Sequence, residues 1–442
     1  DKNVFEIEIA KQSFGKEGIG YLDGKIIFVP FSLKGDKLLV ELEKEKKDFS
    51  TAKIIKIIDP SPLRISPKCP LFGQCGGCHY QFTDYRNELD FKDEVVANFI
   101  KQYDLPENIL NKIILSPAEW SSRIRITLHH AILHDKVLLG FYEFSSHHII
   151  EFEKCYLVPD KMNTAINALR KTLNSKINDV RKIHSTIKDV NIQIDSQENI
   201  LIYFNLFREY KDLKKSYKSL SSAVFNSCPE ITGTLFVDNH HETYIRKYIS
   251  GKERLSYKIP VSDNLTDLQI TPPAFSQVNT GTVNNILSYI RNNVLSGISS
   301  NAVFLDVFGG AGLFSASFKN LFSNNYLLEL NKTAVNDAVV NLKSASNFRY
   351  LIGKAEKTIK MIREKYSDFY ILLDPPRAGL SGDFIRSILN MKPKKIIYLS
   401  CKPSTFFRDA KIINNDMPLT AIQPFDMFPK TYHIEILGVF SL

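Results

Sequence analysis

Short apolar runs with a period of two dominate the first 59 residues. The runs VFEIEIAK, GIGYLDGKIIFVPF, GDKLLVELEK and TAKIIKIID alternate apolar and polar positions, and glycines stand between several of them. Such alternation is typical of half-buried strands, so five short strands predict a small β-barrel of the OB type over residues 1–59. The proline-rich stretch DPSPLRISPKCP follows and predicts a linker, because proline continues neither a strand nor a helix well.

A mixed pattern of strands and helices occupies residues 60–270. The periodicity predicts helices over 84–103 and around 160–174, and strands near 122–133, 137–143, 190–206 and 233–249. This order predicts a central α+β domain. Its segment WSSRIRITLHH puts Arg123 and Arg125 on the same side of a strand, where two guanidinium groups can clamp an RNA phosphate. A solvated strand face is an equally good interpretation of this pair.

From residue 271 the pattern changes to strands that alternate with helices. NAVFLDV is followed by FGGAGLFSASFKNLF and NYLLELN by another helical pattern, and FYILLDPPRAGL and KIIYLSCKP come later. This order predicts a Rossmann-like, doubly wound parallel sheet over residues 271–442, and the fold class is therefore α/β multidomain. The final runs LTAIQPFDMFP and YHIEILGVFSL predict a closing antiparallel pair. That ending is typical of S-adenosylmethionine-dependent methyltransferases more than of dehydrogenases.

Composition narrows the choice of partner and compartment. Lysine and arginine number 57 against 48 acidic residues, a formal net charge of +9 with a pI near 9.0, which leans weakly toward RNA as the partner. The chain has no apolar stretch of about eighteen residues and no signal-peptide pattern, so we expect a cytoplasmic monomer without a membrane segment. Six cysteines in a reducing compartment favour metal binding or catalysis over disulfides.

The segment DVFGGAGLF joins the first predicted strand of the C-terminal block to its helix. Gly309, Gly310 and Gly312 permit a tight turn and a close approach of the backbone to a ligand. The spacing is not that of a dinucleotide fingerprint, G-x-G-x-x-G, so a pyrophosphate is not required. Glu329 ends the second strand, where a carboxylate can accept hydrogen bonds from ribose hydroxyls. Together with the antiparallel ending, these features predict a nucleoside cofactor without pyrophosphate.

Cys401 stands where the last apolar parallel strand ends. It follows the run IIYLS and precedes Lys402-Pro403, so its thiol belongs at the edge of the sheet where α/β proteins place their chemistry. Taken alone, it would more often be a small buried filler. The neighbouring strand ends in LLDPPRAGL, which presents Asp374 at the same edge. Arg377 occupies the position that is aromatic in enzymes that methylate exocyclic amines, so methylation of carbon is the better hypothesis.

A thiol at this edge suits methylation of C5 of uracil. That carbon is a poor nucleophile until a thiolate adds to C6 and generates an enolate. A base must later remove the C5 proton so that the thiolate can leave. Glu435 in FPKTYHIEIL lies between two isoleucines, where desolvation raises the pKa of a carboxyl group and suits it to this role. The alternative is an edge-strand carboxylate that faces water.

Three further cysteines lie within ten residues of one another. Cys69, Cys75 and Cys78 form a C-x5-C-x2-C run in CPLFGQCGGCHYQ, and Cys155 stands alone in FEKCYL. Three thiolates with a distant fourth can hold a [4Fe–4S] cluster. Tetrahedral zinc is the competing interpretation, but structural zinc sites favour paired C-x2-4-C knuckles and this run has one. The cluster, with all four thiolates used, would be structural or would position RNA.

These motifs together resemble the bacterial RNA uridine-C5 methyltransferases, specifically the iron–sulfur-containing 23S rRNA (uracil-5-)-methyltransferase type. The resemblance covers nearly the whole chain: a head similar to the RNA-binding TRAM barrel, the cysteine run, FSQVN, DVFGGAGLF, DPPRAGL, YLSCKPSTFFRD and DMFPKTYHIE. It implies Cys401 as the nucleophile and Glu435 as the proton acceptor. It also implies that S-adenosylmethionine or the target base is contacted by four residues, Gln277, Phe308, Glu329 and Asp374. The substrate it implies is 23S rRNA, with tRNA as the alternative.

The chain departs from the pattern of that family at a few positions. Gly309 stands where the family usually has cysteine, Lys402 where it has asparagine, and Leu313 and Lys354 where polar Asn or Asp is common. A non-catalytic RNA-binding assembly factor is a second hypothesis, which intact Cys401, Glu435 and Asp374 oppose. Cytosine methylation is a third, but RNA enzymes of that class use two active-site cysteines. Here only Cys228, outside the α/β block, is unassigned.

Overall fold

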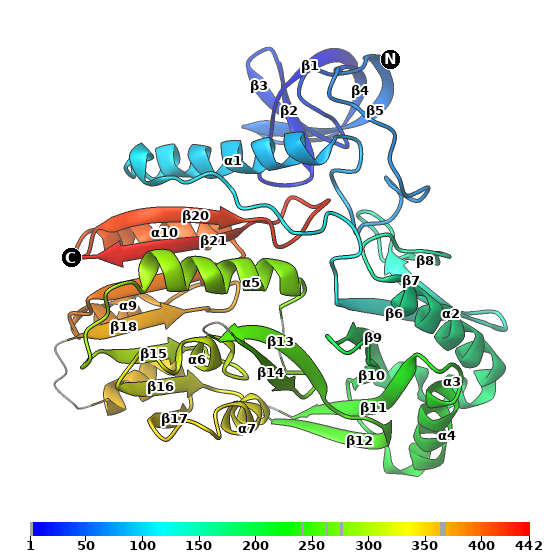
Figure 1. The fold of residues 1–442 in the computed structure, drawn as a ribbon. Helices are drawn as coiled ribbons and strands as arrows, with labels where there is room; N and C mark the ends of the chain where they lie inside the picture. The colour runs from blue at the N-terminus through cyan, green and yellow to red at the C-terminus, as the bar shows by residue number, and fades with distance from the viewer. Residues whose placement is uncertain (1–2, 241–242, 262–263, 275–276, 363–367) are drawn as a thin grey trace.

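Strands organise the molecule into a barrel, two large sheets and a hairpin (Figure 1). This computed structural model describes residues 3–240, 243–261, 264–274, 277–362 and 368–442. The barrel lies at the top of Figure 1, the central sheet at the right and the C-terminal sheet at the left. Among the described helices, none has the length and apolar character that crossing a membrane requires.

The N-terminal block closes into the five-stranded barrel that its alternation predicts. Its strands are β1 (Val4–Gln12), β2 (Glu17–Leu22), β3 (Lys25–Pro30), β4 (Lys37–Glu45) and β5 (Phe49–Asp59), and their order around the barrel is β1-β2-β3-β5-β4. Inward-facing side chains such as Val29 and Val40 form its core. Buried Asp36 anchors the following linker by accepting two hydrogen bonds from the guanidinium of Arg64.

The central block forms a seven-stranded sheet with helices on one face. The strand order is β12-β11-β10-β9-β6-β7-β8. The strands are β6 (Arg125–Leu133), β7 (Lys136–Tyr142), β8 (Ile149–Ile150), β9 (Ile187–Ile194), β10 (Ile200–Leu206), β11 (Ile231–His240) and β12 (Thr243–Gly251). The helices are α2 (Asp160–Ser175), α3 (Ile177–Ile183) and α4 (Lys214–Phe225), and short helical turns cover Glu107–Ile109, His184–Thr186 and Lys211–Leu213.

The C-terminal sheet confirms the doubly wound prediction. Its order is β17-β16-β15-β18-β19-β21-β20, parallel except for β21, which is antiparallel to both neighbours. The strands are β15 (Val303–Val307), β16 (Asn324–Glu329), β17 (Phe348–Ile352), β18 (Phe369–Leu373), β19 (Lys395–Ser400), β20 (Leu419–Phe425) and β21 (Glu435–Ser441). The helices are α5 (Thr280–Tyr289), α6 (Leu313–Phe318), α7 (Lys332–Asn341), α8 (Ala355–Thr358), α9 (Gly382–Leu389) and α10 (Pro403–Asn414), with further turns at Ile290–Val294 and Ile359–Met361.

Two elements from before residue 270 pack on the C-terminal sheet. Helix α1 (Tyr85–Gln102) joins its core, and Phe99 stacks on Phe407 of α10 with ring centroids 5.2 Å apart. The hairpin of β13 (Leu255–Val261) and β14 (Asn264–Ile270) covers the opposite face together with α5. Both elements precede residue 270, but the side chains that they pack against come after it. The contacts therefore cross the domain boundary predicted at residue 270.

The barrel is docked on α1 and on the loop that precedes β21. Phe14 makes edge-to-face contacts with Phe99 and with Tyr432, each at 5.7 Å between centroids. Leu33 shares a small buried cluster with Tyr80 and Phe91. The predicted RNA-binding head therefore has a side chain within contact of the segment that leads to Glu435.

Candidate active site and the four-cysteine pocket

A pocket of about 650 Å³ opens at the carboxyl edge of the C-terminal sheet. Four of the predicted cofactor residues line it: Gln277, Phe308, Gly310 and Asp374. The rest of its wall is largely apolar and includes side chains of the β13–β14 hairpin and of α5. Sequence reasoning missed the hairpin residues, because their period of two indicates a strand without indicating which sheet it covers.

The glycine loop at the end of β15 has the conformations that its sequence predicts. Gly310 and Gly312 have φ of +53° and +84°, and Phe308 also has a positive φ of +64°. A β-carbon added at Gly310 would meet no atom within 4 Å, so its backbone stays open to a ligand. The N–H groups of Gly310 and Asn331 donate to the two oxygens of Glu329 at 3.0 and 2.7 Å. Glu329 therefore lies beside the loop, and each oxygen retains a lone pair for a ribose hydroxyl.

Gly309 accounts for one departure from the family pattern. A β-carbon at this position would lie 2.8 Å from Cγ of Leu327 and 3.1 Å from Cγ of Asp306. The packing of β16 against the loop thus excludes a side chain here unless the neighbours shift. Lys402 is exposed at the start of α10, and Lys354 is exposed before α8.

Two aspartates at the ends of β15 and β18 lie close enough to influence each other. Partial burial, and then the charge of Asp306, raise the pKa of Asp374 to about 7, while a hydrogen bond from Gln277 opposes the shift. Burial raises the pKa of Asp306 to about 6, although the backbone N–H and hydroxyl of Ser315 both donate to it. Asp306 was missed in the sequence, although it precedes the glycine loop at the same sheet edge as Glu329.

Cys401 lies half-buried between the end of β19 and the start of α10. Burial, and then the adjacent Glu435 carboxylate, raise the pKa of its thiol. A hydrogen bond from the guanidinium of Arg377 opposes this shift. Arg377 is therefore placed to stabilise the thiolate form of Cys401. In the sequence, Arg377 indicates only that methylation of an exocyclic amine is disfavoured.

Glu435 begins β21 beside Cys401. Ser400 of β19 is paired with Ile436 of β21, so Cys401, which follows Ser400, and Glu435, which precedes Ile436, lie side by side at the edge of the sheet. The Glu435 side chain is 2% exposed, and β21 lies between β19 and β20. The alternative of a solvent-facing edge carboxylate is thus excluded. Burial, followed by the charge of Asp374, raises the pKa of Glu435 well above its usual range.

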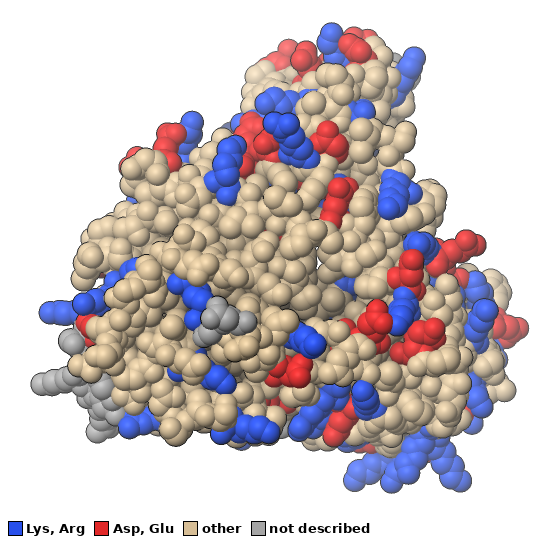
Figure 2. Space-filling model, viewed as in Figure 1, with Lys and Arg blue, Asp and Glu red and all other residues tan. Residues whose placement is uncertain are grey.

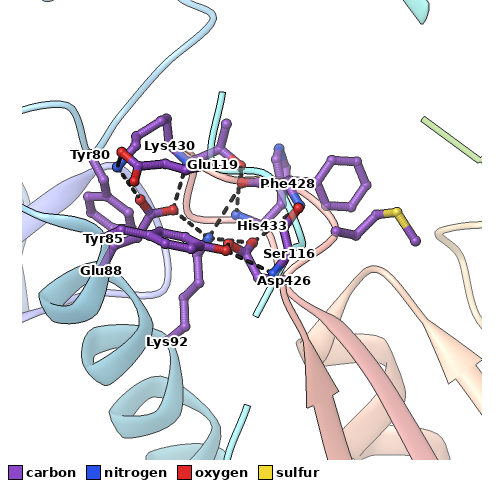
Figure 3. Close-up of polar contacts among 12 residues, drawn as sticks. Tyr80, Tyr85, Glu88, Lys92, Ser116, Glu119, Asp426, Phe428, Lys430 and His433 are labelled. Atoms are coloured by element: carbon purple, nitrogen blue, oxygen red, sulfur yellow. Dashed lines mark hydrogen bonds and ion pairs between the residues drawn. The ribbon is translucent and has the colours of Figure 1, made fainter. Parts of the chain in front are cut away.

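A buried ion network holds the loop that precedes Glu435 (Figure 3). Lys92 of α1 donates to Glu88 at 2.7 Å and to Asp426 at 2.8 Å. Lys430 lies 3.2 Å from Glu88 and 2.8 Å from Glu119, and its backbone N–H also donates to Glu88. Except for Glu119, these side chains are at most 1% exposed, and removing one partner from such a network costs roughly 3–5 kcal/mol. The network therefore orders the backbone from Asp426 to Glu435.

The four predicted cluster ligands line one apolar pocket of about 560 Å³. They come from the 69–78 segment and from Cys155, after β8, and all four are free thiols: Cys69, Cys75, Cys78 and Cys155. Burial raises the pKa of Cys75 and Cys155, and that of Cys78 to about 12. The next residues contact the loop that precedes Glu435, because the N–H groups of His79 and Tyr80 donate to the carbonyl of Lys430 at 2.7 and 3.2 Å.

No three His, Cys, Asp or Glu side chains in the described ranges are grouped so that they could hold a single metal ion. In a zinc site, each sulfur lies about 2.3 Å from one atom. In a [4Fe–4S] cluster, the thiolates are spread over four iron atoms and need a wider pocket. The four thiols share one pocket, and together they offer the four-thiolate donor set that a [4Fe–4S] cluster uses.

The structure does not bring Arg123 and Arg125 together as a phosphate clamp. Arg123 precedes β6 and lines the cysteine pocket, where its buried Nε has no hydrogen-bond partner among the described residues. Arg125, the first residue of β6, lines a separate polar pocket. Cys228 packs on the core of the central domain, away from the thiol at Cys401. Phe275 and Ser276 of FSQVN lie outside the described residues.

Comparison with known proteins agrees with these assignments at the level of family and fold. Residues 84–441 match the family described as tRNA (Uracil-5-)-methyltransferase, and residues 3–55 match the TRAM domain. An uncharacterised RNA methyltransferase of Caldanaerobacter subterraneus is 28% identical over 450 residues, which cover 98% of this chain and 97% of the relative. One from Thermotoga maritima is 27% identical over 444 residues, with 97% of each chain covered.

A solved structure matches nearly the whole chain. It is the crystal structure of Pyrococcus abyssi tRNA (uracil-54, C5)-methyltransferase in complex with S-adenosyl-L-homocysteine. Its TM-score is 0.72 at 21% sequence identity, and the match covers 98% of this chain and 100% of that one. The two proteins therefore share their fold from the barrel to the C-terminal sheet.

Proposed function

The chain belongs to the tRNA (uracil-5-)-methyltransferase family, and from this premise we propose that it methylates C5 of a uridine in RNA with S-adenosylmethionine. The observation that carries the proposal is the position of Cys401 beside buried Glu435 at the edge of the sheet that bears the glycine loop. A nucleophile and a base are both needed for carbon methylation of uracil. This pair also opposes a non-catalytic RNA-binding factor.

The proposed reaction begins with Cys401. Its sulfur forms a bond to C6 of uracil, and the electrons of the C5–C6 double bond move toward O4 to give an enolate. The enolate electrons then form a bond from C5 to the methyl group of S-adenosylmethionine, the bond between that methyl group and the sulfonium sulfur breaks, and S-adenosylhomocysteine leaves with the electron pair on its sulfur. Arg377, hydrogen-bonded to Cys401, is proposed to favour the thiolate before the addition and after its release, in opposition to the burial that raises the pKa of this thiol.

Glu435 completes the reaction as the base. It removes the proton that remains on C5, the electron pair restores the C5–C6 bond, and the bond between C6 and the sulfur of Cys401 breaks. The raised pKa of Glu435 makes its carboxylate a stronger proton acceptor than an exposed glutamate. The ion network around Lys92 and Lys430 is proposed to keep this carboxylate in place.

The pocket fits the nucleoside cofactor of this proposal. The open backbone at Gly310 and the adjacent Glu329 suit the adenosine part, and the apolar wall suits an adenine ring. Gln277 and Asp374 lie in the same pocket and are proposed to contact the cofactor or the target base.

A [4Fe–4S] cluster is proposed for the cysteine pocket. Cys69, Cys75, Cys78 and Cys155 would hold it, and their shared apolar pocket supports the assignment. Bonds from these four thiolates to a cluster would tie the 69–78 segment to the central domain. Because His79 and Tyr80 hydrogen-bond to Lys430, its role would be to order the loop before Glu435, and no catalytic step depends on it.

For the substrate, we propose 23S rRNA first, because the cysteine motif is that of the iron–sulfur type. tRNA is the second candidate, since the matched family and the solved relative are named for tRNA. The test is methyl transfer from methyl-labelled S-adenosylmethionine to rRNA and tRNA that lack 5-methyluridine, followed by nucleoside analysis. Label in 5-methyluridine from rRNA alone is expected. Label from tRNA alone reverses the substrate assignment, and label in no uridine overturns the function.

A further inference from the structure

An open groove of about 1420 Å³ lies on the central domain between α4, β12 and the turn before α4. Its wall is rich in lysine and is formed in part by Lys211, Lys214, Lys218 and Lys247. In Figure 2, basic side chains gather at the lower right, over the position of α4 in Figure 1. This groove belongs neither to the barrel nor to the candidate active site.

Most of these lysines are not neutralised by neighbours. Lys247 is paired with Glu209 and Asp238. Lys214, Lys215 and Lys218 are exposed, and none forms an ion pair with another described residue. Lys214 and Lys218 line the groove, and Lys215 lies beside them at the start of α4. Three such cations within five residues repel one another, which favours a polyanion as the occupant of the groove.

Aromatic side chains stand beside the lysines. Phe207 and Tyr210 precede α4 and are 69% and 46% exposed. The guanidinium of Arg208 lies over the ring of Tyr210, 5.5 Å from its centroid. Exposed rings among cations offer stacking surfaces for bases next to contacts for phosphates, and an ordinary solvated helix face has no need of them. Asp212 is the one exposed acid in this segment.

A separate polar pocket of the central domain is lined by residues that lie close in the chain to both sites. Its walls include Arg125, Lys188, Asn205 and Leu206. Leu206 lies three residues before Glu209, which lines the lysine groove, so at most about 11 Å of chain separates them. At the other end, Arg125 follows Ile124, which lines the cofactor pocket and hydrogen-bonds to Val278.

We propose that this lysine groove is a second RNA-binding surface, which holds the backbone of the substrate RNA at a distance from the target uridine. The proposal rests on the proposed function for the identity of the polyanion. The RNA runs from the uridine at Cys401, past Arg125 and Lys188, to Lys214, Lys215 and Lys218. A fragment that carries only the target loop does not reach these lysines.

The test compares two triple variants of the full chain that remove equal charge. Lys214→Gln/Lys215→Gln/Lys218→Gln neutralises the groove, and Lys343→Gln/Lys357→Gln/Lys360→Gln neutralises three exposed lysines of the C-terminal domain. Binding is measured with total tRNA and with fragmented rRNA in separate arms, over a series of salt concentrations, and with a short uridine hairpin. Thermal unfolding and S-adenosylmethionine binding check that both variants are folded.

The groove variant should bind long RNA about tenfold more weakly or worse, and its log–log salt slope should fall by roughly two to three, one contact for each lysine. Its affinity for the short hairpin and its kcat should match those of the control variant. The RNA arm that shows the loss identifies the source of the RNA. Equal affinity and equal salt slope for long RNA in the two variants overturns the proposal. A wild-type protein that transfers no methyl group to uridine overturns the proposed function alone, because binding is measured without catalysis.

Discussion

Cys401 lies in surroundings similar to those of the four pocket cysteines, which are Cys69, Cys75, Cys78 and Cys155, but its neighbours differ from theirs. The thiols of both sites are half-buried, and in each site an arginine lies near them, Arg377 at one and Arg123 at the other. In the pocket, thiols face other thiols. At the sheet edge, a single thiol faces a buried carboxylate.

The difference shows that the chemistry of a cysteine depends on what lies opposite it. Burial raises the pKa of most of these thiols, so burial does not distinguish a nucleophile from a metal ligand. Four converging thiolates offer a complete donor set. One thiol beside a base offers addition and elimination at a carbon atom. The first three predictions each change one residue of the catalytic site, and the last changes one cysteine of the four-cysteine pocket.

Cys401→Ala should have the largest effect. Without the sulfur, no enolate forms at C6, so methylation should fall by at least about 10⁴-fold and no covalent RNA adduct should appear. Methyl transfer and denaturing electrophoresis measure the two results. Cys228→Ala is the matched control and should keep near wild-type activity, because Cys228 packs on the core of another domain. Methylation by Cys401→Ala at a normal rate would show that the nucleophile is misassigned.

Glu435→Gln should lower turnover by about 10²–10⁴-fold but retain addition and methyl transfer. An amide cannot accept the C5 proton, so the enzyme should stall as an adduct before elimination. Electrophoresis under denaturing conditions should show an RNA–protein band that carries methyl label. The double variant with Cys401→Ala should lack this band. Normal turnover without a band would assign the base to another group.

The regular parts of the fold were predictable because their periodicity is strong. The helix predicted over 84–103 is observed at Tyr85–Gln102, and the buried strands of the C-terminal sheet follow the predicted order. The positions of Cys401, Glu435 and the glycine loop were also predictable, because strand ends in a parallel sheet meet at one edge. Local sequence contains this information.

Contacts between distant segments were not predictable in the same way. Lys430 and Glu88 are 342 residues apart. Nothing in the sequence around either residue indicates that the two side chains are buried together. Arg123 and Arg125 have the spacing of one strand face, yet β6 begins at Arg125 and Arg123 turns into the cysteine pocket. A single sequence records neither the partner of a hairpin nor the exact start of a strand.

Arg377→Gln should have a smaller effect that depends on pH. The thiolate is the reactive form, so addition speeds up as pH rises through the pKa of Cys401. Because the hydrogen bond from Arg377 lowers that pKa, its loss raises the pKa and moves the rising limb of the profile to higher pH. The rate at neutral pH should fall about tenfold and recover in alkaline buffer.

In Glu435→Gln, the pH profile of adduct formation should shift to lower pH, which is opposite to the shift expected for Arg377→Gln. Removal of the neighbouring carboxylate lowers the pKa of Cys401, so addition should begin at lower pH than in the wild type.

Arg386→Gln is the control for the Arg377→Gln change, since Arg386 is exposed and pairs with Asp383. A profile for Arg377→Gln that coincides with the wild-type profile would separate Arg377 from the thiol.

Cys155→Ser should affect methyl transfer least and metal content most. If the pocket holds a [4Fe–4S] cluster, the anaerobically purified wild type should be brown, absorb near about 400 nm and contain about four irons per chain. Cys155→Ser removes one of four thiolates and should lose most of this iron, whereas Cys228→Ser, a change in the same domain, should keep it. Activity should fall only severalfold, because the pocket acts on Glu435 through the hydrogen bonds from His79 and Tyr80 to Lys430. Stoichiometric zinc without iron in the wild type would contradict the cluster. Loss of activity as complete as in Cys401→Ala, with the protein still folded, would show that the two thiol sites do not have separate roles.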